Sequence, residues 1–138
     1  MDSTFEGAER LYRAVYPPSH PGMYWKKDGR ISPSAFADPK GLSVERAFYR
    51  KSEEIVEKMK KAFSGCIVSL SVQDCRDVDA VVKYLPSRDN EYHSEIHSSN
   101  TVVLLNKSQR FHLAEVANKE YMESLHPDNL VKKMQMIK

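Results

Sequence analysis

The stretch SEEIVEKMKKAFSGCIVSLSV, residues 52–72, decides the fold class because a helix and a strand follow each other in it. Residues 52–63 begin with a capping serine and two glutamates and end with lysines before Gly65, as helices typically do. Residues 66–72 alternate in the manner of a strand. The apolar stripe expected on the helix comprises Ile55, Val56, Met59, Ala62 and Phe63, and the buried face expected on the strand comprises Cys66, Val68, Leu70 and Val72.

Outward from this unit, the sequence predicts further helices and strands. Ser3 and Glu6 have the spacing of a capping box and favour a short helix that gives way to a strand near Leu11. Ser71 and Asp74 can cap a helical turn. Strands are expected at 80–85, 92–97 and 101–105. A long helix should open at Ser108 and run to Pro127, with a lysine-bearing tail helix after it.

These elements predict an α+β domain with a small mixed β-sheet flanked by about three helices. The 138 residues match the commonest domain size, so we expect a single domain over residues 1–138. Residues 17–41 are rich in Pro, Gly, Ser and Asp and are expected to form a long loop. Residues 127–138 should form a short C-terminal tail.

Composition narrows the function classes. A net charge of +2 argues against nucleic acid as a partner, and no apolar run approaches the roughly 18 residues of a membrane span. The first residues lack the basic start and apolar stretch of a secretory signal, so we expect a cytoplasmic location and reduced thiols at Cys66 and Cys75. Phosphate-binding loops, dinucleotide fingerprints and nucleophile elbows are absent from the sequence.

The segment from Asp28 to Val44 carries the most conspicuous polar pattern. An Asp-Gly turn would present Arg30 together with Ser32 and Ser34 along one extended edge, an arrangement suited to a phosphate or carboxylate. Alternatively, the segment is an ordered loop whose serines bond its own backbone.

The five histidines include one pair, His93 and His97, at a spacing that puts both on one face of a strand. Glu95 would point to the opposite face, so we do not predict a metal site there. An acid–base or hydrogen-bonding role for His93 in a polar cleft fits the sequence better, and we take His93 as the candidate catalytic residue.

The chain resembles a family of small bacterial proteins without an assigned activity. The shared pattern is an early Arg, then G-R-x-S-S-x-A-F, L-S-V and H-x-x-I. The chain departs from it at Pro33, where the family has a second serine, and at Tyr92. The matching residues are Arg13, Gly29, Arg30, Ser32, Ala35, Phe36, Leu42, Ser43, Val44, His93 and Ile96.

In element order the chain is also similar to RES-type domains, which are bacterial toxin domains with an ADP-ribosyltransferase-like fold that consume NAD. This resemblance implies an Arg on an early strand, here Arg13, that binds the pyrophosphate of NAD. It also implies a catalytic glutamate, for which Glu45, Glu91 and Glu95 all remain open.

Two functions follow as hypotheses. In the first, the chain is a small-ligand or nucleotide-binding domain, with NAD as a possible cofactor and with a transferase or hydrolase activity. Its ligand would be bound by Arg13, Arg30, Ser32 and Ser43, and His93 would exchange a proton. In the second, the chain is a non-catalytic accessory or antidote module that contacts a protein partner, or a second copy of itself, through the 19–41 loop and the basic tail.

Overall fold

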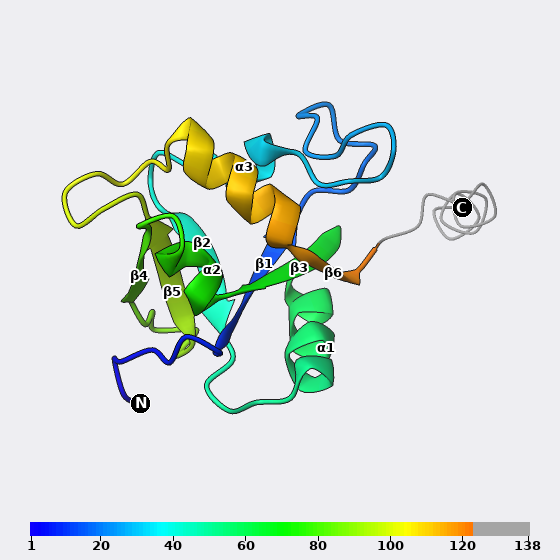
Figure 1. Ribbon diagram of the computed structural model, residues 1–138. Helices are drawn as coiled ribbons and strands as arrows, with labels where there is room; N and C mark the ends of the chain where they lie inside the picture. Colours follow the sequence, from blue (N-terminus) through cyan, green and yellow to red (C-terminus); the bar gives the residue numbers. More distant parts are fainter. Residues whose placement is uncertain (123–138) are drawn as a thin grey trace.

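The computed structural model describes residues 1–122. Its helices are α1 (Ser52–Ala62), α2 (Val72–Arg76) and α3 (Lys107–Val116), with a short 3-10 helix η1 (Pro33–Phe36). Its strands are β1 (Arg10–Val15), β2 (Leu42–Arg46), β3 (Cys66–Ser71), β4 (Val81–Tyr84), β5 (His93–His97) and β6 (Asn118–Tyr121). The strands form one sheet in the order β4-β5-β2-β1-β3-β6 (Figure 1).

The α+β class and the flanking helices are therefore confirmed. The sheet is antiparallel at every pairing within residues 1–122, whereas the sequence alone predicted a mixed sheet. Strand alternation could not reveal this, because the direction of a neighbouring strand depends on connections rather than on side-chain period.

The sheet separates two apolar layers. Cys66, Val68 and Leu70 of β3 pack on one face with residues of η1, α2 and α3. Ile67 points to the other face, where it meets Ile55 and Met59 of α1. Figure 1 shows α1 and α3 on opposite sides of the sheet. The alternation predicted for residues 66–72 is thus confirmed, and it positions the helices on either side.

The unit formed by α1, β3 and α2 matches the sequence expectation closely. The helix and the strand end within one residue of the predicted bounds. The capping box of α2 is present, because Asp74 N donates to Ser71 Oγ at 3.0 Å and Ser71 N donates to Asp74 Oδ2 at 2.8 Å. The cap of α1 differs, since Lys51 occupies the N-cap position and Ser52 is the first helical residue.

Three predicted elements are wrong. The last helix ends at Val116, and the chain then forms β6 along the open edge of β3, where strand pairing satisfies main-chain groups that a longer helix would leave free. Residues 3–9 form no helix. Residues 101–105 form no strand and close a turn through Ser98 N to Val103 O instead. The tail predicted at 127–138 lies outside the described residues.

The N-terminal segment is extended because a buried arginine holds it. Arg46 is fully buried and pairs with Glu9 through Nε and Nη2, both at 2.8 Å. Its remaining donors reach the carbonyls of Asp2 and Thr4. Its guanidinium also lies 4.1 Å from the ring centre of Phe5. Each of the three guanidinium nitrogens therefore donates at least one hydrogen bond, which offsets the cost of burying the charge.

The sheet opens between its two central strands. β1 pairs with β3 along six residues, but it pairs with β2 only at Leu11↔Arg46 and Tyr12↔Glu45. Beyond Tyr12 the two strands separate, which leaves main-chain groups of β2 without partners from β1. The candidate site forms at this opening.

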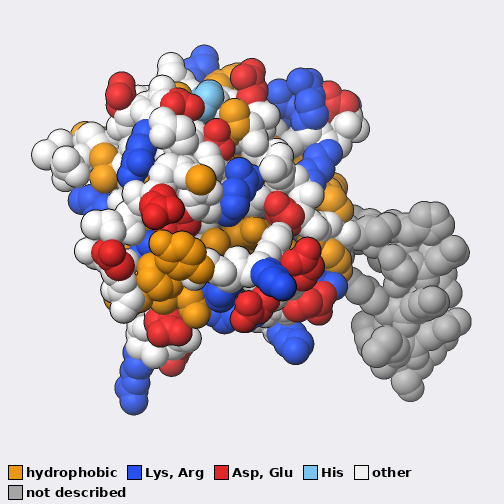
Figure 2. All heavy atoms as spheres, turned by 60° about the horizontal axis from the view of Figure 1, so that its bottom comes forward, with side chains coloured by type: hydrophobic (Ala, Val, Ile, Leu, Met, Phe, Trp, Pro, Cys, Tyr) orange, Lys and Arg blue, Asp and Glu red, His pale blue; other side chains and the backbone are white. Residues whose placement is uncertain are grey.

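The surface is well solvated. Figure 2 shows acidic and basic side chains interspersed over the face that it views, in keeping with the small net charge. No helix within residues 1–122 combines the length and the apolar character needed to cross a membrane.

Candidate functional site

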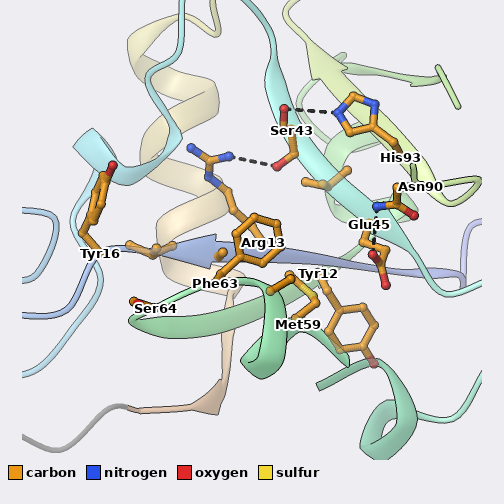
Figure 3. Close-up of a pocket in the computed structure, with 14 residues that line it drawn as sticks. Tyr12, Arg13, Tyr16, Ser43, Glu45, Met59, Phe63, Ser64, Asn90 and His93 are labelled. Atoms are coloured by element: carbon orange, nitrogen blue, oxygen red, sulfur yellow. Dashed lines mark hydrogen bonds between the residues drawn. The ribbon is translucent and has the colours of Figure 1, made fainter. Parts of the chain in front are cut away.

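A cavity of about 410 Å³ lies where β1 and β2 separate, which is within the range typical of small-molecule sites. β1, β2, β5 and the end of α1 supply its walls (Figure 3). It is lined by Tyr12, Arg13, Ala14, Val15, Tyr16, Ser43, Val44, Glu45, Met59, Ala62, Phe63, Ser64, Asn90 and His93.

Arg13 fills the gap between the separating strands. Its Nε donates to the Ala35 carbonyl at 3.0 Å, and its Nη1 donates to the Ser43 carbonyl at 2.9 Å. Within residues 1–122, Nη2 has no hydrogen-bond partner and no carboxylate lies within 4.0 Å of the guanidinium. Burial lowers the pKa of Arg13, while Asp38 and Tyr24 act in the opposite direction. Arg13 is thus a half-buried cation that makes no ion pair within residues 1–122, although the more distant carboxylate of Asp38 favours its charged form.

Ser43 and His93 form a hydrogen-bonded pair at the same cavity. Nδ1 of His93 lies 2.8 Å from the Leu85 carbonyl, which can only accept, so Nδ1 must carry the proton. In the neutral imidazole Nε2 is then an acceptor, and it lies 3.3 Å from Oγ of Ser43. Figure 3 shows the ring of His93 directed at Ser43 from the neighbouring strand. The backbone bond fixes which ring nitrogen faces the serine.

Of the three glutamates that remained open, Glu45 is the one that lines the cavity. Its carboxylate is buried, and Nζ of Lys58 and Nδ2 of Asn90 both donate to Oε1, at 3.2 and 3.0 Å. Oε2 lies 3.0 Å from Nη1 of Arg50 in an ion pair, although outside hydrogen-bond geometry. The negative charge of this carboxylate is therefore balanced by the positive charges of Lys58 and Arg50.

The two other glutamates lie outside the cavity lining. The prediction that Glu95 points to the opposite face of the strand from His93 and His97 is wrong, because residues two positions apart on a strand share a face. Oε1 of Glu95 contacts Nε2 of His97 at 2.8 Å, so His97 is engaged on its own strand rather than with His93. Glu91 is exposed and contributes its carbonyl to Tyr84 Oη.

Aromatic residues that sequence reasoning missed line the rest of the cavity. Phe63 and Ala62 were expected in the buried stripe of the helix, but both are exposed, and 53% of Phe63 is accessible. Helical spacing identifies a face but not where the helix ends, and Phe63 is the C-cap of α1 with an extended backbone. Tyr16, also more than half exposed, stacks on His20 with ring centres 4.1 Å apart. The cavity thus joins a polar end to an aromatic one.

Arg30 and Ser32 lie elsewhere. Nε of Arg30 pairs with Asp28 Oδ2 at 2.7 Å on the surface, and Arg30 N donates to the same carboxylate. Ser32 is the N-cap of η1 and accepts from Ser34 N. The predicted Asp-Gly turn exists, but its polar groups bond one another. The structure therefore unites Arg13, Ser43 and His93 of the predicted set and leaves Arg30 and Ser32 outside the cavity.

A separate group of side chains has the composition of a metal site. Within residues 1–122, donor atoms of Asp74, Asp77 and His112 lie within 4.8 Å of one another. Asp74 already caps α2, and Asp77 accepts from Gln73 at 2.9 Å. This group is remote from the cavity lining and does not enter the chemistry considered below.

In comparisons with protein-family models, curated proteins and solved structures, no match to this chain was found. The two resemblances drawn from sequence motifs therefore stay predictions.

Proposed function

We propose that the cavity binds a small anionic ligand and that Arg13 holds its anion. The observation that carries this proposal is the state of Arg13: a half-buried cation bonded to two carbonyls, with no carboxylate within 4.0 Å in residues 1–122. Removing a guanidinium from water without an ion-pair partner is costly, and an anionic ligand at Nη2 would offset that cost.

The chemistry of the remaining walls favours a ligand with a ring as well as an anion. Phe63 offers an exposed ring beside the polar end, and Tyr16 stacks one face of its ring on His20 while more than half of the residue stays accessible. A heterocyclic base or another planar group can stack on such rings. Nucleotides combine both features, and NAD is the first member of that class to test because the order of elements resembles that of NAD-consuming domains. In this proposal, Ser43 and His93 bond a hydroxyl of the ligand.

A thermal-shift screen with NAD, ADP-ribose, common nucleotides and inorganic phosphate tests the proposal. A ligand that binds only the folded chain at about 100 times its Kd stabilises it by about 2.7 kcal/mol, which raises the melting temperature measurably. We expect at least one of these anions to do so in the natural chain and not in Arg13→Met. If no anion shifts the melting temperature, the ligand proposal fails, and a stable complex with another protein would then favour the interaction module.

A further inference from the structure

We infer that Ser43 is a nucleophile and His93 its general base, and that the cavity hydrolyses an ester whose acid or alcohol part carries a negative charge. This inference rests on the proposed function, since Arg13 must hold the negative group while the serine attacks. It adds a reaction and a covalent intermediate, which ligand binding alone does not require.

The hydroxyl of Ser43, the ring of His93 and the carbonyl of Leu85 form a chain of hydrogen-bonded groups. A nucleophilic serine needs a base within hydrogen-bond reach, and the base needs a third group that orients it. Oγ of Ser43 lies 3.3 Å from Nε2 of His93, and Nδ1 of the same ring lies 2.8 Å from the Leu85 carbonyl. The carbonyl takes the place of the usual carboxylate as the orienting group. Distances of this kind commonly tighten once a substrate is bound.

The side chain of Ser43 is accessible from the cavity. Ser43 is exposed on β2 and lines the cavity, so a substrate can reach its hydroxyl. Ser64 also lines the cavity but bonds none of the histidines within residues 1–122. Imidazole pairing therefore distinguishes one cavity serine from the other.

The guanidinium of Arg13 is bonded to the main chain of Ser43. Nη1 of Arg13 donates to the main-chain carbonyl of Ser43 itself, which fixes the serine backbone and holds the guanidinium beside it. Figure 3 shows Arg13 and His93 approaching Ser43 from different strands. Nη2 lies on the side of the guanidinium away from Ser43, so a substrate whose anion is bound there would extend past the guanidinium to bring its ester to the hydroxyl. Such positioning lowers the barrier of a bimolecular step.

The reaction balances without an additional reagent. The Ser43 oxygen attacks the ester carbonyl as its proton passes to Nε2 of His93, and the C–O bond to the alcohol breaks as that proton passes to the leaving oxygen. Water then attacks the acyl-serine, giving its proton to His93, and the acyl–oxygen bond to Ser43 breaks as that oxygen is reprotonated. The net change is one ester and one water converted into one acid and one alcohol.

Labelling with an alkyl fluorophosphonate tests the nucleophile directly. The probe forms an oxygen–phosphorus bond and releases fluoride, and tandem mass spectrometry locates the adduct. We expect the adduct on Ser43 and none on Ser64. His93→Gln cannot act as a base, so labelling should slow by about 100-fold or more. His97→Gln, on the same strand but bonded to Glu95, should label at the natural rate.

Substrate preference tests the anion requirement. The rate of p-nitrophenol release is compared for the neutral acetate ester and the negatively charged succinate half-ester, and a ribose-acetylated adenosine monophosphate tests a nucleotide as the source of the charge. We expect at least one of the charged esters to be hydrolysed faster than neutral p-nitrophenyl acetate. Arg13→Met should remove this difference in rate. The charged ester that is hydrolysed identifies the source.

The outcomes separate the two claims. An adduct that maps to another residue, or that forms equally fast in a folded His93→Gln chain, overturns the nucleophile. If the anion-dependent melting shift is present but Ser43 stays unlabelled, this inference fails and the proposed function stands. If Ser43 is labelled but no anion binds, the nucleophile stands and the anion site fails. Mapping on the natural chain requires no variant to fold.

Discussion

Nη1 of Arg13 donates to the main-chain carbonyl of Ser43, 30 residues farther along the chain, at 2.9 Å. The bond occurs where β1 and β2 separate, so a side chain replaces a bond that a neighbouring strand would otherwise make. The same residue therefore closes the sheet and brings a positive charge to the cavity. Loss of Arg13 should affect both stability and ligand binding, and the two effects can be separated.

Arg13→Lys keeps the charge but loses the planar fork that spans two carbonyls and a ligand. We expect the Kd for the anionic ligand to rise at least tenfold, because a hydrogen bond to a charged group contributes about 1.5–3 kcal/mol. Isothermal titration calorimetry with the ligand found by thermal shift measures the change. Arg30→Gln is the matched control, since Arg30 is exposed and pairs with Asp28 outside the cavity. An equal loss of ligand affinity in Arg13→Lys and Arg30→Gln would contradict the assignment of Arg13 as the residue that binds the anion.

The second prediction concerns Arg46, which has no part in the cavity. Arg46→Met should lower the free energy of unfolding by about 3–5 kcal/mol, because Glu9 would be left with an uncompensated charge at 10% exposure. Urea denaturation followed by circular dichroism measures the loss. The double variant with Glu9→Gln should lose less than the sum of the two single losses, since the neutral amide no longer needs the guanidinium. Additive losses would show that the pair is not coupled.

The sequence could predict α1, β3 and α2 because their signals are local. A capping box, a helical stripe and strand alternation each involve residues only a few positions apart. The structure keeps the capping box and the alternation, and it buries Ile55 and Met59 of the stripe. β6 depends instead on the free edge of β3, about 50 residues away in the chain. The pattern that predicted one helix from Ser108 to Pro127 gave no sign that strand pairing would compete with it.

The candidate site divides in the same way. Arg13, Ser43 and His93 share one cavity, as the motif pattern suggested, although no spacing rule linked them. Arg30 does not line the cavity. Its guanidinium forms an ion pair with Asp28, two positions before it in the chain, instead of facing a ligand site. The aromatic wall was missed because Phe63 continues the helical stripe in the sequence, whereas in the structure it is the extended C-cap of α1 and is exposed in the cavity.

The third prediction concerns Gly41, just before β2. Its φ is +116°, and a Cβ there would approach Glu95 Cδ to 2.8 Å and Oε1 still more closely. Gly41→Ala should cost about 1–3 kcal/mol through backbone strain and displacement of Glu95 from His97. Thermal and urea unfolding measure the loss.

Gly29 is the control for the backbone part of that loss. Its φ is +89°, but the nearest atom to a Cβ there is Nζ of Lys119 at 3.7 Å, so Gly29→Ala meets strain without a clash. It should cost less than Gly41→Ala. The double variant Gly41→Ala/Glu95→Ala should regain only the part of the lost stability that comes from the clash with Glu95. If the two glycine variants lose equal stability, the close approach of Glu95 is not what restricts position 41.

The fourth prediction is a loss of stability at alkaline pH that depends on Cys75. Burial, reinforced by the charge of Asp74, raises the pKa of this thiol from 9.0 to about 12. The folded chain therefore keeps the proton at pH values where the unfolded chain releases it, so the stabilisation is complete below pH 9 and declines as the pH rises toward about 12. The slope from this group is at most about 1.4 kcal/mol per pH unit.

Urea unfolding at several pH values from 8 upward, about half a unit apart, measures that slope in the natural chain and in Cys75→Ala. The alanine variant should be less stable at every pH because it leaves a cavity in the core, but its curve should fall less steeply above pH 9. Only the difference in slope concerns the thiol, since lysines and tyrosines titrate in both chains. Parallel curves would mean that the thiol ionises as readily in the folded chain as in the unfolded one, which burial at 0% exposure opposes.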